Sequence, residues 1–111
     1  MTLHKAEKVV IITEKIISKG VCDIILACGA TGYTIVPAGG KGSRNMRSTP
    51  DSAFVVDGFA NVKIDTIVRD KALAESIMAQ VAEKYFAHYS GITYVESVEI
   101  LRPEKFYKTS D

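Results

Sequence analysis

The chain has 111 residues, of which 47% are hydrophobic and 24% charged, and its formal net charge is +1. This length corresponds to a single domain over residues 1–111, and the composition excludes a disordered chain. The longest apolar runs, Val9–Ile12 and Ile24–Cys28, are far shorter than the roughly 18–20 residues that cross a bilayer. The first residues lack the apolar stretch of a secretory signal. We therefore expect a cytoplasmic protein without membrane insertion and without a nucleic-acid partner.

The first half of the chain predicts a strand, a helix and a second strand. Lys8–Ile12 is a β-branched run typical of a buried strand. Apolar residues at helical spacing predict a helix over Glu14–Cys28, for which Thr13 would be the cap. A second strand is expected over Thr31–Val36, ended by Pro37, which cannot donate to a ladder.

The second half predicts another strand, helix and strand after a long connection at 38–61. A strand is expected over Val62–Val68, where apolar and polar residues alternate. Asp70 is a suitable N-cap for a helix over Lys71–Tyr89. The last strand is expected over Ile92–Leu101, followed by a polar tail at 102–111. The order β-α-β-loop-β-α-β predicts an α+β, ferredoxin-like βαββαβ sandwich, with two helices on one face of a four-stranded antiparallel sheet.

The long connection contains the segment most informative about function, Gly39–Thr49. Lys41, Arg44 and Arg47 place three positive charges close together, without an acidic residue. Glycines let backbone N–H groups converge on an anion, and arginine binds phosphate through two parallel hydrogen bonds. The segment therefore predicts binding of a phosphorylated small molecule, and a solvated basic loop is the alternative. It is not a P-loop, because Gly42 follows Lys41 where a serine or threonine is required.

Other chemistry-bearing residues predict neither catalysis nor a metal site. His4 and His88 have no partner in the sequence pattern, and the carboxylates belong to solvated faces. We therefore expect a protein that is not an enzyme. Phe54 and Phe59 in the long connection suit contact with a protein partner, although a self-packed hairpin around Asp57-Gly58 would also explain them.

Four segments together resemble the PII-like signalling proteins of the SbtB type. They are Ile11–Lys15, Gly29–Thr34, Gly39–Ser48 and Tyr89–Ile92. The resemblance runs from about Lys8 to Leu101, and the string Gly-Gly-Lys-Gly-Ser-Arg-Asn-x-Arg-Ser is its specific part.

The resemblance implies a homotrimer that binds the adenine nucleotides cAMP, AMP, ADP and ATP in clefts between subunits. It implies that 38–61 is the T-loop, and that the protein regulates a sodium-dependent bicarbonate transporter of the SbtA type, with which it would associate reversibly at the membrane. Tyr33 and Thr34 are expected to be structural. Whether Mg²⁺ or Ca²⁺ accompanies ATP stays open. The nucleotide-binding residues implied are Gly39, Gly40, Lys41, Gly42, Ser43, Arg44, Arg47 and Gly91.

Two alternatives accompany this interpretation. Some members of the family end in a loop with two cysteines, proposed as a redox switch linked to nucleotide hydrolysis, whereas residues 101–111 contain no cysteine. A weak nucleotide phosphohydrolase is therefore disfavoured, also because no general base can be placed beside the basic segment. A carboxysome-associated PII-like protein that binds ADP or AMP with bicarbonate is the other alternative.

Overall fold

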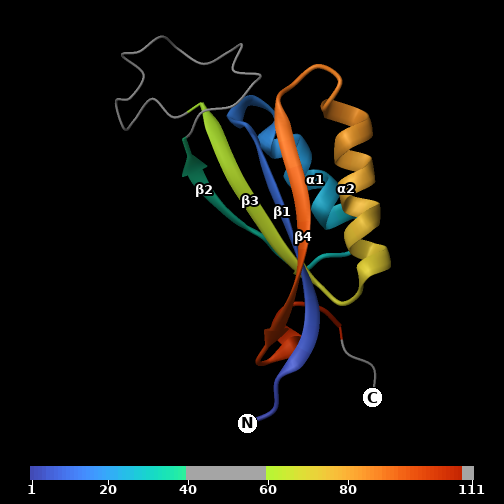
Figure 1. The fold of residues 1–111 in the computed structure, drawn as a ribbon. Coiled ribbons are helices and arrows are strands. Elements are labelled where there is room, and N and C mark those ends of the chain that lie inside the picture. The colour runs from blue at the N-terminus through green and yellow to red at the C-terminus, as the bar shows by residue number, and fades with distance from the viewer. Residues whose placement is uncertain (40–59, 109–111) are drawn as a thin grey trace.

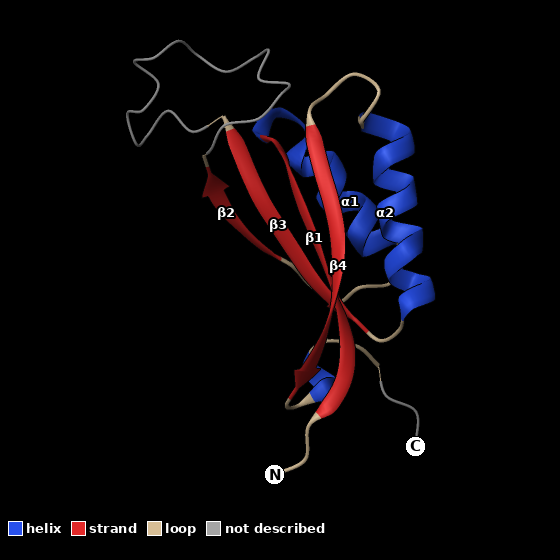
Figure 2. Cartoon of the chain, in the orientation of Figure 1, coloured by secondary structure: helices blue, strands red, loops and turns tan. Residues whose placement is uncertain are grey.

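The computed structural model describes residues 1–39 and 60–108. In this part of the chain the strands form a four-stranded antiparallel sheet in the order β2-β3-β1-β4, and the two α-helices cover one of its faces (Figure 1, Figure 2). The elements are β1 (His4–Glu14), the 3₁₀ helix η1 (Lys15–Ile17), α1 (Ser18–Ala27), β2 (Thr34–Ala38), β3 (Asn61–Val68), α2 (Lys71–Tyr85), β4 (Gly91–Ile100) and the 3₁₀ helix η4 (Pro103–Lys105). The predicted ferredoxin-like α+β fold is confirmed.

The β-branched run of β1 lies in the centre of the sheet, paired with β3 on one side and β4 on the other. Val9 and Ile11 face the helices and are fully buried in the core. The core is completed by apolar residues of both helices and of β3. At the start of α2 the predicted cap is confirmed, because the Asp70 carboxylate accepts a hydrogen bond of 2.9 Å from the Leu73 N–H.

The sheet face opposite the helices carries apolar residues beside charged ones, because Lys63 and Asp65 of β3 lie on it in register with Val36 and Val10. Val10 is fully buried there between Tyr94 of β4 and Asp65 of β3, with which it is in register. Around it, Ile92 is 58% exposed, Tyr94 39% and Val36 44%. The sequence pattern groups Ile92 and Tyr94 on one face of the last strand. The structure shows that this is the face without helices.

The end of β1 differs from the prediction. Glu14 was expected to begin a helix, but it is the last residue of β1, and α1 begins only at Ser18 after the 3₁₀ turn. Thr13 does not cap a helix, because its hydroxyl donates to the Ser90 carbonyl instead. β1 also begins at His4 rather than Lys8, since its pairing with β4 continues to that residue. Long-range pairing therefore overrides the local helical pattern here.

Two further boundaries were wrong by several residues. β2 begins at Thr34 rather than Thr31, and it continues through Pro37, which is tolerated because β2 is an edge strand. The second helix ends at Tyr85 rather than Tyr89. The chain turns there, and the Tyr85 carbonyl accepts from the N–H groups of both His88 and Tyr89.

The segment predicted as a polar tail is partly folded onto the domain. Pro103–Lys105 form η4, and the Thr31 hydroxyl donates a hydrogen bond of 2.7 Å to the Phe106 carbonyl. The Arg69 guanidinium donates to the Lys108 carbonyl and lies 5.5 Å from the centre of the Tyr107 ring. These contacts fix residues 103–108 against the start of β2 and the end of β3.

Among the described helices none has the length and apolar content needed to cross a bilayer.

Candidate functional site

The base of the glycine-rich segment lies at one end of the sheet. Gly39 directly follows β2 and is exposed, and Ala60 directly precedes β3. The Lys15 N–H donates a hydrogen bond of 2.7 Å to the Ala60 carbonyl, which fastens this base to the end of β1. Several predicted features lie outside the described residues, namely Gly40, Lys41, Gly42, Ser43, Arg44, Arg47, Phe54, Phe59 and the hairpin at Asp57-Gly58.

Gly91 lies at the same end of the sheet, on the opposite edge. It is in register with Thr13, which is in register with Val62, which in turn pairs with Pro37. Three strand spacings of about 4.8 Å therefore separate Gly91 from the end of β2 within one subunit, or roughly 14 Å. The structure also gives Gly91 a packing role. A Cβ atom on it would lie 2.4 Å from Phe86 Cε1 and 2.9 Å from Thr13 Oγ1.

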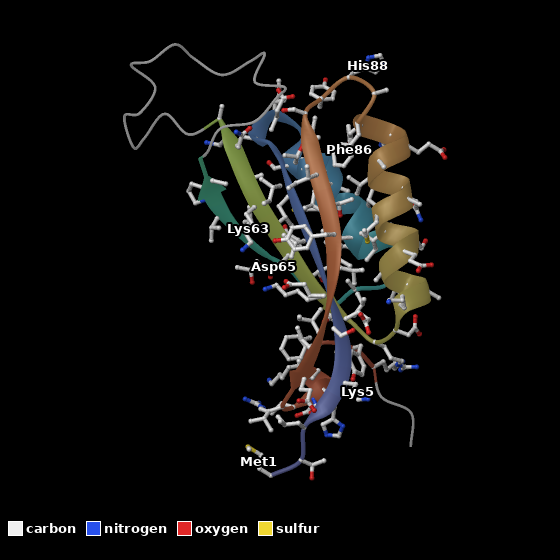
Figure 3. The ribbon with its side chains drawn as sticks, viewed as in Figure 1. Met1, Lys5, Lys63, Asp65, Phe86 and His88 are labelled. Carbon is white, nitrogen blue, oxygen red and sulfur yellow. The ribbon has the colours of Figure 1, made fainter. Side chains whose placement is uncertain are left out.

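The turn between α2 and β4 passes over this end of the sheet, where Figure 3 labels Phe86 and His88. Ser90, the last residue of this turn, makes hydrogen bonds through both its N–H group and its carbonyl group. Its N–H donates to Glu14 Oε2 over 2.7 Å, and its carbonyl accepts from the Thr13 hydroxyl over 2.7 Å. The turn is thus tied to the end of β1, as is the base of the glycine-rich segment.

A hollow of about 210 Å³ lies further down the sheet. It is lined by Thr31, Gly32, Tyr33, Thr34, Asp65, Thr66, Ile67, Lys105 and Phe106. The buried Thr66 hydroxyl fixes one wall by donating 2.6 Å to the Gly32 carbonyl. Sequence analysis missed Asp65, Lys105 and Phe106 here. No local signal reveals them, because the C-terminal segment reaches Thr31 from 75 residues away.

Tyr33 and Thr34 were both expected to be structural, and the structure shows the surroundings of each. The Tyr33 hydroxyl is hydrogen-bonded to the Cys22 thiol, and this bond raises the pKa of Tyr33. Burial raises the pKa of Cys22, while the bond to Tyr33 opposes the rise. Both Tyr33 and Thr34 are exposed, and both line the hollow. Within 1–39 and 60–108, His, Cys, Asp and Glu form no group of three or more with metal-binding geometry.

Comparison with protein families identifies the family to which this fold belongs. Residues 6–105 match the family described as nitrogen regulatory protein P-II. The chain belongs to the P-II family. The fastened loop base after β2 and the turn before β4 are therefore features of a PII-like signalling protein.

Solved structures of related proteins support membership of the P-II family. The chain is 38% identical to a PII-like signalling protein from Thermus thermophilus, with a TM-score of 0.75, over 96% of this chain and 99% of that one. It is 27% identical to CPII from Thiomonas intermedia bound to ADP and bicarbonate, with a TM-score of 0.77, over 95% and 97% of the two chains. CPII bound to ADP, AMP and acetate matches at 26% identity and a TM-score of 0.75, over 97% and 100%.

Proposed function

We propose that this PII-like protein is a homotrimeric sensor of adenine nucleotides and acts by binding rather than by catalysis. The observation that carries the proposal is the P-II family match over residues 6–105, joined to the ADP held by its relative CPII. The phosphate-binding chemistry of the glycine-rich basic segment agrees with such a ligand.

The exposed apolar residues on the open face of the sheet support the proposed trimer. Antiparallel sheets that face water normally carry polar residues on that side. Here Ile92, Tyr94 and Val36 are exposed beside the buried Val10, on the face that the helices do not cover. An exposed apolar surface of this kind marks an interaction site, and a second and third copy of the chain would cover it.

We place the nucleotide between subunits, as the family resemblance implies. The phosphates would bind Gly39–Ser43, Arg44 and Arg47 of one subunit, and the nucleoside would lie near Gly91 of a neighbour. Support comes from the register, because the end of β2 and Gly91 lie at one end of the sheet but roughly 14 Å apart in a single subunit. A neighbouring subunit would bring a second Gly91 closer to the loop base.

We propose that the protein partner is a sodium-dependent bicarbonate transporter of the SbtA type, contacted through Phe54 and Phe59 in the 38–61 connection. A second candidate function has its own support, because CPII is described with ADP and bicarbonate bound. In that case bicarbonate would be a ligand of this protein, and its partner would be associated with carboxysomes. Titrating bicarbonate in the presence of ADP separates the two: saturable binding favours the CPII-like role.

Calorimetric titration with cAMP, ADP and ATP tests the nucleotide site. Arg44→Ala and Arg47→Ala should each weaken binding by about 10–100-fold, because charge-assisted bonds to phosphate contribute roughly 1.5–3 kcal/mol. Lys41→Ala should lose less, since an ammonium is a point charge rather than a fork. Lys19→Ala is the matched control: it also removes one positive charge, but this side chain is bonded to Asp23 on α1. Binding that is unchanged in both arginine variants would refute the proposed site.

Light scattering tests the trimer separately. Wild type should show about three times the 12.1 kDa chain mass. Tyr94→Glu should dissociate it, because a carboxylate would be buried in the apolar face. Leu26→Glu is the control, since Leu26 is similarly exposed but lies on α1, on the other side of the sheet. A monomeric wild type at micromolar concentration would contradict the proposal.

A further inference from the structure

Thr13, Glu14 and Lys15 belong to a motif that the proposed nucleotide site leaves without a role. Each of these three consecutive residues contacts a loop at the same end of the sheet. Thr13 and Glu14 bind Ser90 in the turn before β4, and Lys15 binds Ala60 at the base of the glycine-rich segment. The end of β1 therefore contacts both loops of its own subunit, and each of these loops would contribute to a different intersubunit site.

Glu14 is unusual among these residues because its carboxylate is buried, with only 6% of the residue exposed. Burial of a charged group is unfavourable unless it is hydrogen-bonded. Its Oε2 atom accepts from the Ser90 N–H over 2.7 Å and from the Ser90 hydroxyl over 3.4 Å. Glu14 is also the N-cap residue of η1, yet its side chain makes no capping bond there. The buried carboxylate therefore serves the turn rather than the helix.

The register shows why this position matters. Glu14 is in register with Asn61, the residue after Ala60, and Thr13 is in register with Gly91. The backbone of β1 thus connects to the loop base through one neighbour and to the turn through the other. A carboxylate that fixes Ser90 also fixes the position of Gly91, the next residue, at this end of the sheet.

We infer that Glu14 is a positioning residue for the nucleotide site: it holds the Ser90-Gly91 turn in a fixed place on the end of β1, where Gly91 would face the nucleotide bound by the loop of a neighbouring subunit. The inference rests on the proposed function. Groups held in place before binding avoid the entropic cost of ordering when the ligand arrives. Loss of this bond should therefore weaken nucleotide binding even though Glu14 need not touch the nucleotide.

Two variants of Glu14 separate geometry from charge. Glu14→Gln keeps the length of the side chain and an oxygen that can accept from the Ser90 N–H. Glu14→Asp keeps the charge, but its carboxylate is one methylene shorter. The control is Glu7→Asp, because Glu7 also lies on β1 and accepts from a serine hydroxyl, that of Ser97 in β4, but toward the opposite end of the sheet.

The experiment combines ADP titration with hydrogen exchange of the 86–92 peptide in the ligand-free protein. Glu14→Asp should bind ADP about tenfold more weakly and exchange faster in this peptide, whereas Glu14→Gln should stay within about threefold of wild type. Glu7→Asp should match wild type in both measurements. A purely structural role would instead raise exchange across the whole domain. If Glu14→Asp does not fold, Thr13→Val removes the other bond to Ser90 and should show the same local change with a smaller loss of affinity.

The outcomes distinguish the inference from the proposed function. If wild type binds ADP and Glu14→Asp binds it equally well, Glu14 does not position the site. If the 86–92 peptide exchanges at the wild-type rate in Glu14→Asp, the carboxylate does not hold the turn. If wild type itself binds no adenine nucleotide, the proposed function is refuted, and the role of Glu14 in nucleotide binding is refuted with it. The exchange measurement then still reports whether the bond holds the turn.

Discussion

Replacing Gly91 with alanine should destabilise the protein through Phe86. The added Cβ would lie 2.4 and 2.8 Å from two carbons of the Phe86 ring, whereas carbon atoms in favourable contact are about 3.5–4.0 Å apart. The ring would have to retreat by roughly 1 Å, although it is packed against the core between the end of α2 and β4. The third neighbour, Thr13 Oγ1, is held by its bond to Ser90. The clash therefore cannot be relieved by moving one free side-chain end.

Overpacking of this kind costs about 1–3 kcal/mol. For a chain of this length, the expected fall in the melting midpoint is about 4–12 °C. The assay is thermal unfolding followed by circular dichroism, with all variants at one protein concentration, because the stability of an oligomer depends on concentration. The double variant Gly91→Ala/Phe86→Leu should recover part of the loss, which would appear in a double-mutant cycle as a coupling of at least about 1 kcal/mol.

Gly32→Ala is the matched control, because a Cβ at Gly32 meets nothing within 4 Å. It should be neutral or slightly stabilising. A Gly91→Ala protein that melts within about 1 °C of wild type would refute the reasoning, since Phe86 would then relax without cost. If stability fell but ADP affinity were unchanged, Gly91 would be required for packing and not for the nucleotide.

Three further predictions each concern one residue. Asp70→Ala should cost about 1 kcal/mol in urea unfolding, because the Leu73 N–H loses its cap; an unchanged midpoint would contradict this. Gly29→Ala should cost at least about 1 kcal/mol in the same assay, because Gly29 has φ +107°, where a side chain is strained even with no atom nearby. Burial raises the pKa of Cys22, so at pH 8 a smaller fraction of this thiol is ionised than in an exposed cysteine. Iodoacetamide should therefore modify the buried Cys22 more slowly than Cys28, and equal rates by mass spectrometry would refute this prediction.

Local pattern was sufficient for the order and type of the main elements. The β-branched run of β1, the alternation in β3 and the cap at Asp70 each reflect interactions within a few residues. Boundaries failed where distant contacts decide them. Glu14 was predicted as the first residue of a helix, but pairing with β3 and the bond to Ser90, 76 residues away, keep it in the strand.

The candidate site was predictable only in part, for a similar reason. A glycine-rich basic segment is visible in the sequence because its residues are contiguous. Three contacts depend instead on which segments are neighbours in space: the bond of Glu14 to Ser90, the packing of Gly91 against Phe86, and the bond of Thr31 to the Phe106 carbonyl. Alternation on the last strand grouped Ile92 with Tyr94 but did not reveal which face the helices would leave open.

Pro37 has a consequence for how copies of this chain can associate. A chain could polymerise into an endless sheet if the β2 edge of one copy paired with the β4 edge of the next. Pro37 lies within the five-residue β2, and a proline in a ladder is tolerated with its nitrogen directed away from the neighbouring strand. The outer edge of β2 therefore lacks a hydrogen-bond donor where an incoming strand would need one. Strand addition at this edge is therefore disfavoured, while face-to-face association into a closed assembly stays available.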